Sequence, residues 1–380
     1  MIYHPFDLRQ LAKETHSQCD FFLHQHHQHL SFDCSTQIKN DETDNEGGKL
    51  SDIFTPNFVS PICYTVKIKD CIIGPRPEGI SRYWPVFFGE NYAFNFLSTA
   101  AKEAYVRQQI FKTLKDDSIE FDATTIDFVE INGPCVWLYT FYNVDHLIRE
   151  TLPTIVALEE MGLDLRELKL IVPSVSGTGI LELLTALGIP LQNIIQAERR
   201  WLRFKEVYVP CFFSFGHLHT PSSYYRATAN RVLRAVRDIK TDTKTPKRIF
   251  VSRERANMRR LLNEKYIHSD LIDRGFEIID PGSLTKLAQA KYLNNAEIVV
   301  GQHGMGIANG IYAQPGCKIV EIMHTNYNRV SYFRTAQYLS GEYGAYYVRP
   351  IELKYSHKSD KFGDVLVDKT DLIEFIDRFI

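Results

Sequence analysis

The sequence contains no long hydrophobic run, and no segment approaches the roughly 18 apolar residues that a membrane-spanning helix requires. Its first residues, MIYHPFDLRQLAKETHSQ, lack the apolar core of a signal peptide. The seven cysteines are scattered and include no Cys-x-x-Cys pair, so they fit neither a disulfide framework nor a zinc site. We therefore expect reduced thiols and a cytoplasmic protein, either free or at the inner face of a membrane.

An excess of positive charge is also missing. The 44 Lys and Arg residues are matched by 46 Asp and Glu, for a net charge of -2, which argues against nucleic acid as the main partner. Residues 24–29, HQHHQH, do bring histidines together. Without flanking carboxylates or cysteines, this tract is typical of a solvated surface segment, and weak metal retention is the alternative. We expect no metal site.

The common nucleotide-binding signatures are absent as well. The chain has no Gly-x-Gly-x-x-Gly fingerprint, no Gly-rich loop followed by Lys-Ser/Thr, and no Asp-x-Asp after a strand. What it does have is an ordinary globular composition, 44% hydrophobic and 24% charged, over 380 residues. That length exceeds one comfortable core and suits two domains of about 100–200 residues each.

Strand-like and helix-like segments alternate through the first half. Residues 36–50, TQIKNDETDNEGGKL, are predicted as an exposed loop or linker. The spacing of apolar residues then predicts strands within 61–97, a helix over 97–117, two strands around the turn at 132–134, and a helix over 143–163 that breaks at Pro153. A strand over 168–174, a helix over 177–190 and a strand over 206–216 follow.

The second half alternates more regularly. We expect strands at 247–253, 276–282, 297–304 and 317–323, and helices at 222–240, 257–275, 284–296 and from Met305 onward. This order predicts an α/β fold with a Rossmann-like parallel sheet. We place an N-terminal α/β domain at 1–225, with an irregular segment over 1–60, and a C-terminal Rossmann-like domain at 226–348. Residues 349–380 end in a helix that packs back on either domain.

A cluster of arginines follows the strand at 247–253: Arg253, Arg255, Arg259 and Arg260. Ligands of open α/β sheets bind at this edge, and guanidinium groups offer rigid, paired donors to phosphate oxygens. Ser252 lies at the same strand end. The alternative is a solvated basic helix face paired with acidic neighbours, which fits Arg259 or Arg260 better than Arg253.

A glycine-rich turn, VVGQHGMGIANGIYAQPG, follows the strand at 297–304. Glycines at 301, 304 and 306 let backbone amides approach a ligand closely, and the next helix adds its positive end. His303, flanked by glycines, is expected at the tip of the loop. A purely structural turn is the alternative. Glu321 falls in or at the end of the next strand, where it either accepts ribose hydroxyls or sits at a solvated strand end.

These segments together resemble glycosyltransferase family 61. VSRERANMRRLLNE, RGFEIID, VVGQHGMGIANGIYAQPG and KIVEIM occur in the family's order and spacing over about 247–323. FYNVDHLIRETLPTIVAL resembles an upstream family segment more weakly, with His146, Glu150 and Pro153 at its fixed positions. Met305 replaces the usual alanine, and Val144-Asp145 replaces an aromatic pair. The first 120 residues show no match.

The resemblance implies a GT-B architecture, in which two Rossmann-like domains face each other across a cleft. Family members are inverting enzymes, many use UDP-sugars, and none of them needs a metal or another cofactor. Arg253 and Arg259 would stabilise the diphosphate with the amides of the glycine turn, and Glu321 would hold the ribose. His303 would contact the leaving group or act as the base, and Met305 would narrow the site. The implied donor-binding residues are Ser252, Arg253, Arg259, Asn263, His303, Gly304, Met305, Gly306, Asn309 and Glu321.

Inversion at the anomeric carbon is a single in-line displacement, which needs a base for the acceptor hydroxyl and positive groups for the departing diphosphate. We expect the base in the N-terminal domain: His146 first, then Glu150 or Asp145. A purely structural role for His146, bonded within its helix, is the alternative.

We therefore expect a hexosyl- or pentosyltransferase that moves a sugar from a nucleotide sugar to a saccharide or lipid-linked saccharide acceptor in bacterial capsule or lipopolysaccharide synthesis. A non-catalytic nucleotide- or phosphosugar-binding protein is the alternative. The basic helix at 224–240, with Arg226, Arg231 and Arg234, could also lie on an anionic membrane. Most such helices simply cover a core.

Overall fold

A computed structural model gives the architecture of the chain. It describes residues 2–6, 17–26, 28–43, 47–75, 86–89, 92–94, 103, 106–110, 112–113, 118–139, 143–173, 178–197, 200–215, 220–237, 245–351 and 363–380. Most of the helix expected over 97–117 lies outside these residues. Among them, no helix is long and apolar enough to cross a membrane.

The chain divides into two compact units, and both are built from more than one stretch of sequence. The first unit comprises Met1–His26, Ile62–Tyr142 and Glu150–Phe213, and the second comprises His27–Pro61, Asn143–Arg149 and Ser214–Ile380. The two-domain GT-B arrangement and the domain boundaries expected from the sequence stay predictions. The α/β character is confirmed in both units.

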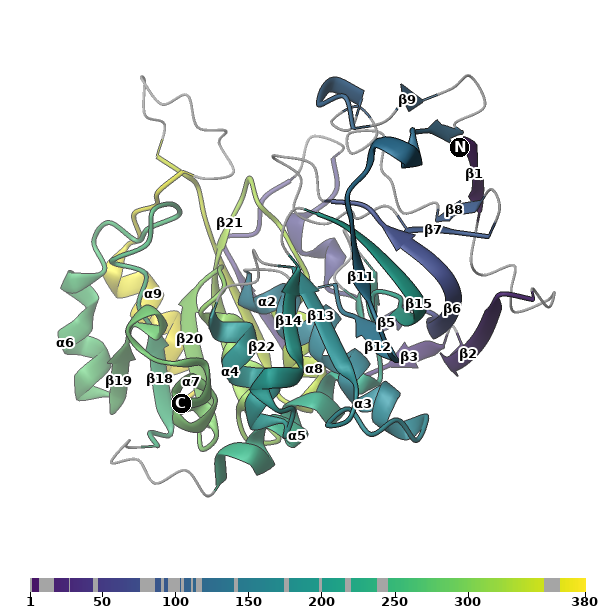
Figure 1. Cartoon of the computed structure of the whole chain (residues 1–380). Helices are drawn as coiled ribbons and strands as arrows, with labels where there is room; N and C mark the ends of the chain where they lie inside the picture. The colour runs from purple at the N-terminus through teal and green to yellow at the C-terminus, as the bar shows by residue number, and fades with distance from the viewer. Residues whose placement is uncertain are drawn as a thin grey trace. The chain divides into compact units, whose positions relative to one another are not determined.

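The second unit contains a parallel sheet in the order β19-β18-β20-β21-β22-β4 (Figure 1). Every neighbouring pair in this sheet runs parallel, as the alternation of apolar strands and helices predicts. Its strands are β18 (Arg248–Val251), β19 (Phe276–Ile279), β20 (Ile298–Gln302), β21 (Lys318–His324), β22 (Tyr343–Val348) and β4 (Thr36–Lys39).

Helices cover both faces of this sheet. On one face, α6 (Lys265–Asp273) packs with α9 (Lys369–Asp377), and both join the core that includes Phe250 and Ile322 (Figure 1). The other group of packed helices comprises α5 (Tyr224–Arg237), α7 (Lys286–Leu293), the 3₁₀ helix η8 (Ile307–Tyr312) and α8 (Ser331–Tyr338). The C-terminal helix α9 therefore packs on the second unit.

The strand order creates a switch point between β18 and β20. The chain leaves β18 through α6 to reach β19 on one side, and it returns through α7 to β20 on the other side. Val251 at the end of β18 lies opposite Gly301 near the end of β20. In doubly wound sheets this is where ligands bind, because the two loops that follow diverge.

The first unit is built on a mixed sheet. Strands β12 (Cys135–Trp137), β13 (Lys169–Pro173), β14 (Ile194–Ala197) and β15 (Trp201–Pro210) run parallel, and β6 (Cys63–Ile73) pairs antiparallel with β15. The remaining strands of this sheet are β1 (Ile2–Phe6), β2 (Cys19–Gln25), β7 (Val86–Phe88), β8 (Tyr92–Phe94), β9 (Lys112–Thr113), β10 (Ile119–Glu120) and β11 (Phe128–Ile131). Its helices include α3 (Leu152–Glu160) and α4 (Thr178–Ala186).

Three expectations about local structure need correction. Residues 36–39 are not a loop but the strand β4 at the edge of the second sheet, where a polar sequence is tolerated because one side has no strand partner. Residues 257–264 are not helical, since α6 begins only at Lys265 and Arg259 has a φ of 51°, which a right-handed helix excludes. The two strands expected around 132–134 do form, as β11 and β12. Each of them pairs in parallel with a different part of β15.

The helix predicted over 143–163 is confirmed, with an irregular middle. It starts as α2 (Val144–His146), passes through a π turn over Leu147–Thr151, and continues as α3. Pro153 explains the irregularity, because it cannot donate a backbone hydrogen bond to the preceding turn. Short strand pairs elsewhere are β3 (His29–Ser31) with β5 (Asn57–Val59) and β16 (Ser214–Phe215) with β17 (Thr220–Pro221).

Candidate donor-binding site

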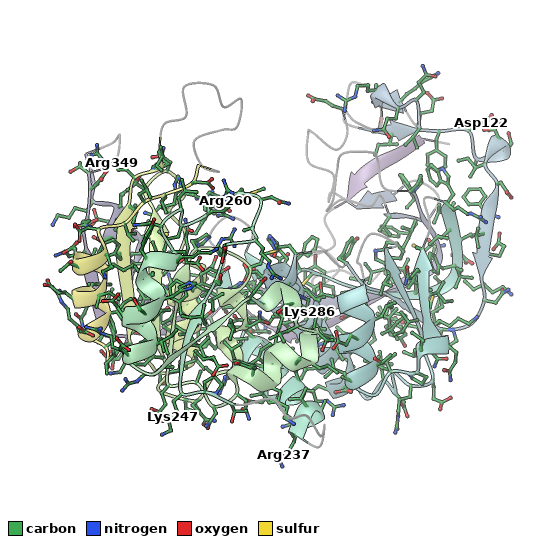
Figure 2. The ribbon with its side chains drawn as sticks, turned by 90° about the vertical axis from the view of Figure 1, so that its left-hand side faces the viewer. Asp122, Arg237, Lys247, Arg260, Lys286 and Arg349 are labelled. Atoms are coloured by element: carbon green, nitrogen blue, oxygen red, sulfur yellow. The ribbon has the colours of Figure 1, made fainter. Side chains whose placement is uncertain are left out.

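The loop after β18 is folded around a buried glutamate. Glu264 is 2% exposed; one of its oxygens accepts the hydroxyl of Ser252, and the other accepts the backbone N–H of Arg253 at 3.0 Å. Figure 2 shows the two ends of this strand, with Lys247 just before β18 and Arg260 in the loop beyond it, at opposite ends of the sheet. The chain thus folds back to the end of β18, where Glu264 fixes the loop.

Arg253 is the central cation of this loop. Its Nε donates to the carbonyl of Arg259 at 3.2 Å, and its Nη2 donates to the carbonyl of Met258 at 2.9 Å. Burial, and after it the neighbouring charge of Arg259, lower the pKa of the Arg253 guanidinium to about 10. The side chain still carries its charge at neutral pH, and an anion beside it would relieve both penalties.

Gly304 makes room for Arg253. A Cβ atom at this position would lie 2.0 Å from Nη1 of Arg253, well inside any real contact. A Cβ at Gly306 would lie 2.6 Å from Cγ1 of Val251 at the end of β18. The glycines therefore let the turn after β20 close directly onto β18 and its arginine.

Arg259 has unused hydrogen-bonding capacity. Its Nε and Nη1 atoms are buried and have no hydrogen-bond partner in the described part of the chain. The guanidinium lies 4.6 Å from the ring centre of Tyr327, and the guanidinium of Arg329 lies at the same distance from that ring. Buried donors without acceptors are costly, so this arginine is suited to a ligand that brings anionic oxygens.

The turn after β20 is held at both ends. The N–H of His303 donates to the carbonyl of Ile322 at 3.0 Å, and the N–H of Ile307 donates to the carbonyl of Gly304 at 3.1 Å. Between them, within the described residues, no protein acceptor is recorded for the N–H groups of 304–306. We call Arg253, Arg259, His303, Gly304 and Gly306 the switch-point cluster.

His303 belongs to a buried polar network. Its Nδ1 bonds to Oε1 of Glu321, and Oε2 of Glu321 accepts the hydroxyl of Tyr343 at 2.5 Å. Glu321 is fully buried in β21, so it lies neither at a solvated strand end nor at the surface. The ring of Tyr332 lies 5.1 Å from the ring of His303, and its hydroxyl donates to the carbonyl of Gly304 at 2.7 Å.

Other predicted donor-binding residues have protein partners. The side-chain amide of Asn263 both donates to and accepts from the backbone of Val367. Asn309 is buried and donates to Oε1 of Gln289 at 2.9 Å. Met305 is 43% exposed at the tip of the turn. Their roles toward a donor stay predictions.

The upstream segment reaches the same part of the second unit. Helix α2 packs against η8, which follows the glycine turn. Arg149 is fully buried, pairs with Asp145 at 2.8 Å and donates to the carbonyl of Ser331 at 3.3 Å. His146 is 9% exposed in α2, whereas Glu150 belongs to the first unit and is 4% exposed.

A comparison with protein families indicates which family the residues around this site resemble. Residues 144–320 match the model of the family described as Glycosyltransferase 61. Over these residues the chain is similar to glycosyltransferase family 61. No curated protein matches the chain. The matched region spans the upstream segment, the arginine loop and the glycine turn, so the resemblance expected from the sequence is confirmed, and glycosyl transfer is the activity that the family implies.

Sequence reasoning missed several residues of the candidate site. Tyr332 and Tyr343 hold the glycine turn and Glu321, and Arg329 and Tyr327 lie beside Arg259. None of them falls in a motif that the sequence singled out. The sequence offered one signal, its high content of 20 tyrosines. That content does not indicate which tyrosines lie at the site and which only fill the core.

Two further expectations concern metal and membrane. Among the described residues, no group of three or more His, Cys, Asp or Glu side chains is placed to hold a metal ion. The apolar face of α5 is covered within the second unit, and Arg226 turns inward to the carbonyls of Ile311 and Ala313. Metal independence and membrane association both stay predictions.

Proposed function

We propose that the protein is an inverting glycosyltransferase that moves a sugar from a UDP-sugar to a saccharide or lipid-linked saccharide acceptor in bacterial surface polysaccharide synthesis. The observation that supports this most is the switch-point cluster. It gathers two partly buried arginines, a histidine and a glycine turn with available amides at the edge of the sheet where doubly wound folds bind ligands.

The cluster is suited to the leaving diphosphate. One further negative charge develops on the diphosphate as the bond to the sugar breaks, and preorganised cations and amides stabilise it without having to reorganise. Arg253 and Arg259 supply the charge, and Arg259 has two buried donors without acceptors among the residues that the structure describes. The amides of 304–306 and the ring of His303 complete a surface that recognises diphosphate oxygens.

The base for the acceptor hydroxyl is His146 in this proposal. Asp145 is already the ion-pair partner of the buried Arg149, which leaves it less free to take a proton. Glu150 is the remaining candidate. We further propose a GT-B arrangement of two facing domains and a reaction that needs no metal, because Arg253 and Arg259 would supply the charge that a metal otherwise provides.

The test is a panel of UDP-, GDP-, ADP- and CMP-linked sugars, screened for a rise in melting temperature and then for hydrolysis or transfer in the presence of EDTA. A donor that binds only the folded protein raises the melting temperature. We expect one of the UDP-sugars to bind and to be hydrolysed, with the β configuration at the anomeric carbon if the donor is an α-glycoside.

Two outcomes would contradict this proposal. If no sugar nucleotide binds at millimolar concentration, the donor site is wrong. If a sugar nucleotide binds but its sugar is neither hydrolysed off nor transferred, and His146→Ala leaves the binding unchanged, the protein is a non-catalytic nucleotide- or phosphosugar-binding protein.

A further inference from the structure

A carboxylate with no access to solvent lies beneath the glycine turn. Glu321 is 0% exposed in the middle of β21, and both of its oxygens already have partners, His303 on one side and Tyr343 on the other. A ribose could reach this carboxylate only if the side chains that cover it moved, because none of its surface is exposed. The position of Glu321 therefore favours a role inside the protein over direct contact with the donor.

Tyr343, Glu321 and His303 form a diagonal line across the sheet of the second unit. Gly301 lies opposite Glu321, and Glu321 lies opposite Ala345. Side chains two residues apart on a strand share a face, so Tyr343, Glu321 and His303 all project from the same face. Each step moves two residues toward the carboxyl end of the sheet. The line begins in the buried tyrosine and ends at the switch point.

His303 is fixed in orientation by this line and by its aromatic neighbours. Nδ1 is occupied by Glu321, while the rings of Tyr332 and Tyr327 lie 5.1 and 5.2 Å from the imidazole. Nε2 has no hydrogen-bond partner in the part of the chain that the structure describes, and it is not among the buried atoms that lack one. Nε2 is therefore the nitrogen of His303 that faces outward.

The charge of Glu321 determines what Nε2 can do. An isolated carboxylate in a protein interior costs several kcal/mol, and a cation bonded to it offsets that cost. Burial and the neighbouring Glu321 raise the pKa of Tyr343 well above its usual value, so this phenol stays neutral and serves only as a hydrogen-bond donor. The imidazole of His303 is a basic group bonded to Glu321, and protonated at both nitrogens it would place Nδ1–H on Glu321 and Nε2–H outward.

We propose that Glu321 is a positioning residue: it holds His303 as an imidazolium whose Nε2–H donates to the leaving diphosphate, and it does not contact the ribose. This inference rests on the proposed donor site and specifies how that site works. No proton needs to leave the pair during the reaction, because Nε2–H only donates a hydrogen bond to a phosphate oxygen.

Binding of UDP and of inorganic pyrophosphate by calorimetry separates the two roles of Glu321. Glu321→Gln keeps the shape of the side chain and removes its charge. We expect it to weaken both ligands by a similar factor of about 10, the scale of one charge-assisted hydrogen bond. In the His303→Ala background the same change should have little further effect, because Glu321 acts through the histidine.

A loss of UDP affinity with pyrophosphate binding unchanged would mean that Glu321 holds the ribose, and it would overturn the inference. So would additive effects of the two substitutions. A wild-type protein that binds UDP but not pyrophosphate also contradicts it, since the diphosphate would not be the group recognised. If the wild-type protein binds neither ligand, the donor site itself fails, and the inference fails with it.

A measurement on the wild-type protein covers the case in which Glu321→Gln does not fold. Nitrogen-15 NMR of histidine-labelled protein, with the His303 signals identified by their loss in His303→Ala, reports which ring nitrogens carry protons. We expect both nitrogens to be protonated at neutral pH with UDP bound. A ring protonated at only one nitrogen in that complex would overturn the inference.

Discussion

At the switch point, the small size of single residues matters as much as their chemistry. Gly304 leaves the volume that the guanidinium of Arg253 fills, and Gly306 leaves the volume that Val251 fills. The sequence predicted glycines that let a ligand approach the backbone. The structure adds that they also let two loops of the protein approach each other, which no spacing rule shows, because it depends on which strand lies next to β20.

Replacing Gly304 with alanine should displace Arg253. The added Cβ would lie 2.0 Å from Nη1, and such overpacking costs about 1–3 kcal/mol. We expect UDP affinity to fall at least about tenfold, a loss of the order expected when one charge-assisted contact is removed. Calorimetry measures it. Gly310→Ala is the matched control, because its Cβ would lie 3.1 Å from Cδ1 at the end of the Ile319 side chain and 3.9 Å from Cγ2 of Thr335. Equal losses in both variants would contradict the role of Gly304.

A residue-scale prediction about pH concerns His24 in the first unit. Burial lowers its pKa from 6.5 to about 4, and its Nε2 bonds to the hydroxyl of Thr65 at 2.8 Å. Above pH 6.5 the ring is neutral in both the folded and the unfolded chain. As the pH falls from 6.5 to about 4, the unfolded chain takes up the proton first, so the free energy of unfolding decreases.

Urea denaturation at pH 7, 5.5 and 4.5 measures this decrease. His24→Gln should reduce the pH dependence, whereas His26→Gln, an exposed neighbour, should leave it unchanged. If both variants keep the full pH dependence, His24 is not the group responsible. The histidine tract would then contribute nothing to acid sensitivity.

At the scale of elements, strands β18, β20 and β21 were predictable because buried parallel strands are short, continuous apolar runs. IFV, IVV and KIVEIM each read as such a run. The edge strand β4 was not predictable, because its polar residues carry no such signal. The line from Tyr343 through Glu321 to His303 was also out of reach, since it depends on the register between three strands that are far apart in sequence.

The arginine loop depends on the C-terminal segment that runs beside it. Asp364 accepts the backbone N–H of Arg260 at 2.8 Å and its Nη2 at 2.7 Å. The backbones of Arg260 and Leu262 also exchange hydrogen bonds with Val365. The segment near residue 364 thus fixes the shape of a loop about 100 residues earlier in the chain. We infer that donor affinity depends on it.

Asp364→Ala should loosen this loop without removing any residue of the switch-point cluster. We expect faster amide hydrogen exchange over 253–262 and a loss of UDP affinity of severalfold, on the order of threefold to tenfold. Asp377→Ala is the control, because it breaks a similar pair with Arg274 elsewhere in the second unit. Unchanged exchange in Asp364→Ala would show that the segment does not support the loop.

At the scale of the whole molecule, the strand order and the arginine loop concern the second unit, whereas the family match over 144–320 covers parts of both units. The sequence was informative here because a phosphate-binding edge needs particular residue types at strand ends. It was uninformative about the acceptor, because a saccharide surface has no comparable signature. The account therefore depends chiefly on whether the second unit binds a nucleoside diphosphate through Arg253.

Calorimetric titration of UDP into the wild-type protein, Arg253→Ala and Arg237→Ala tests that claim most directly. Arg237 is an exposed arginine at the end of α5, well away from Arg260 in the same unit (Figure 2). We predict that Arg237→Ala binds UDP as the wild type does, and that Arg253→Ala loses at least about tenfold in affinity, as expected when a charged partner of a phosphate is removed. Equal affinities of all three proteins, or no binding by any of them, would contradict the account.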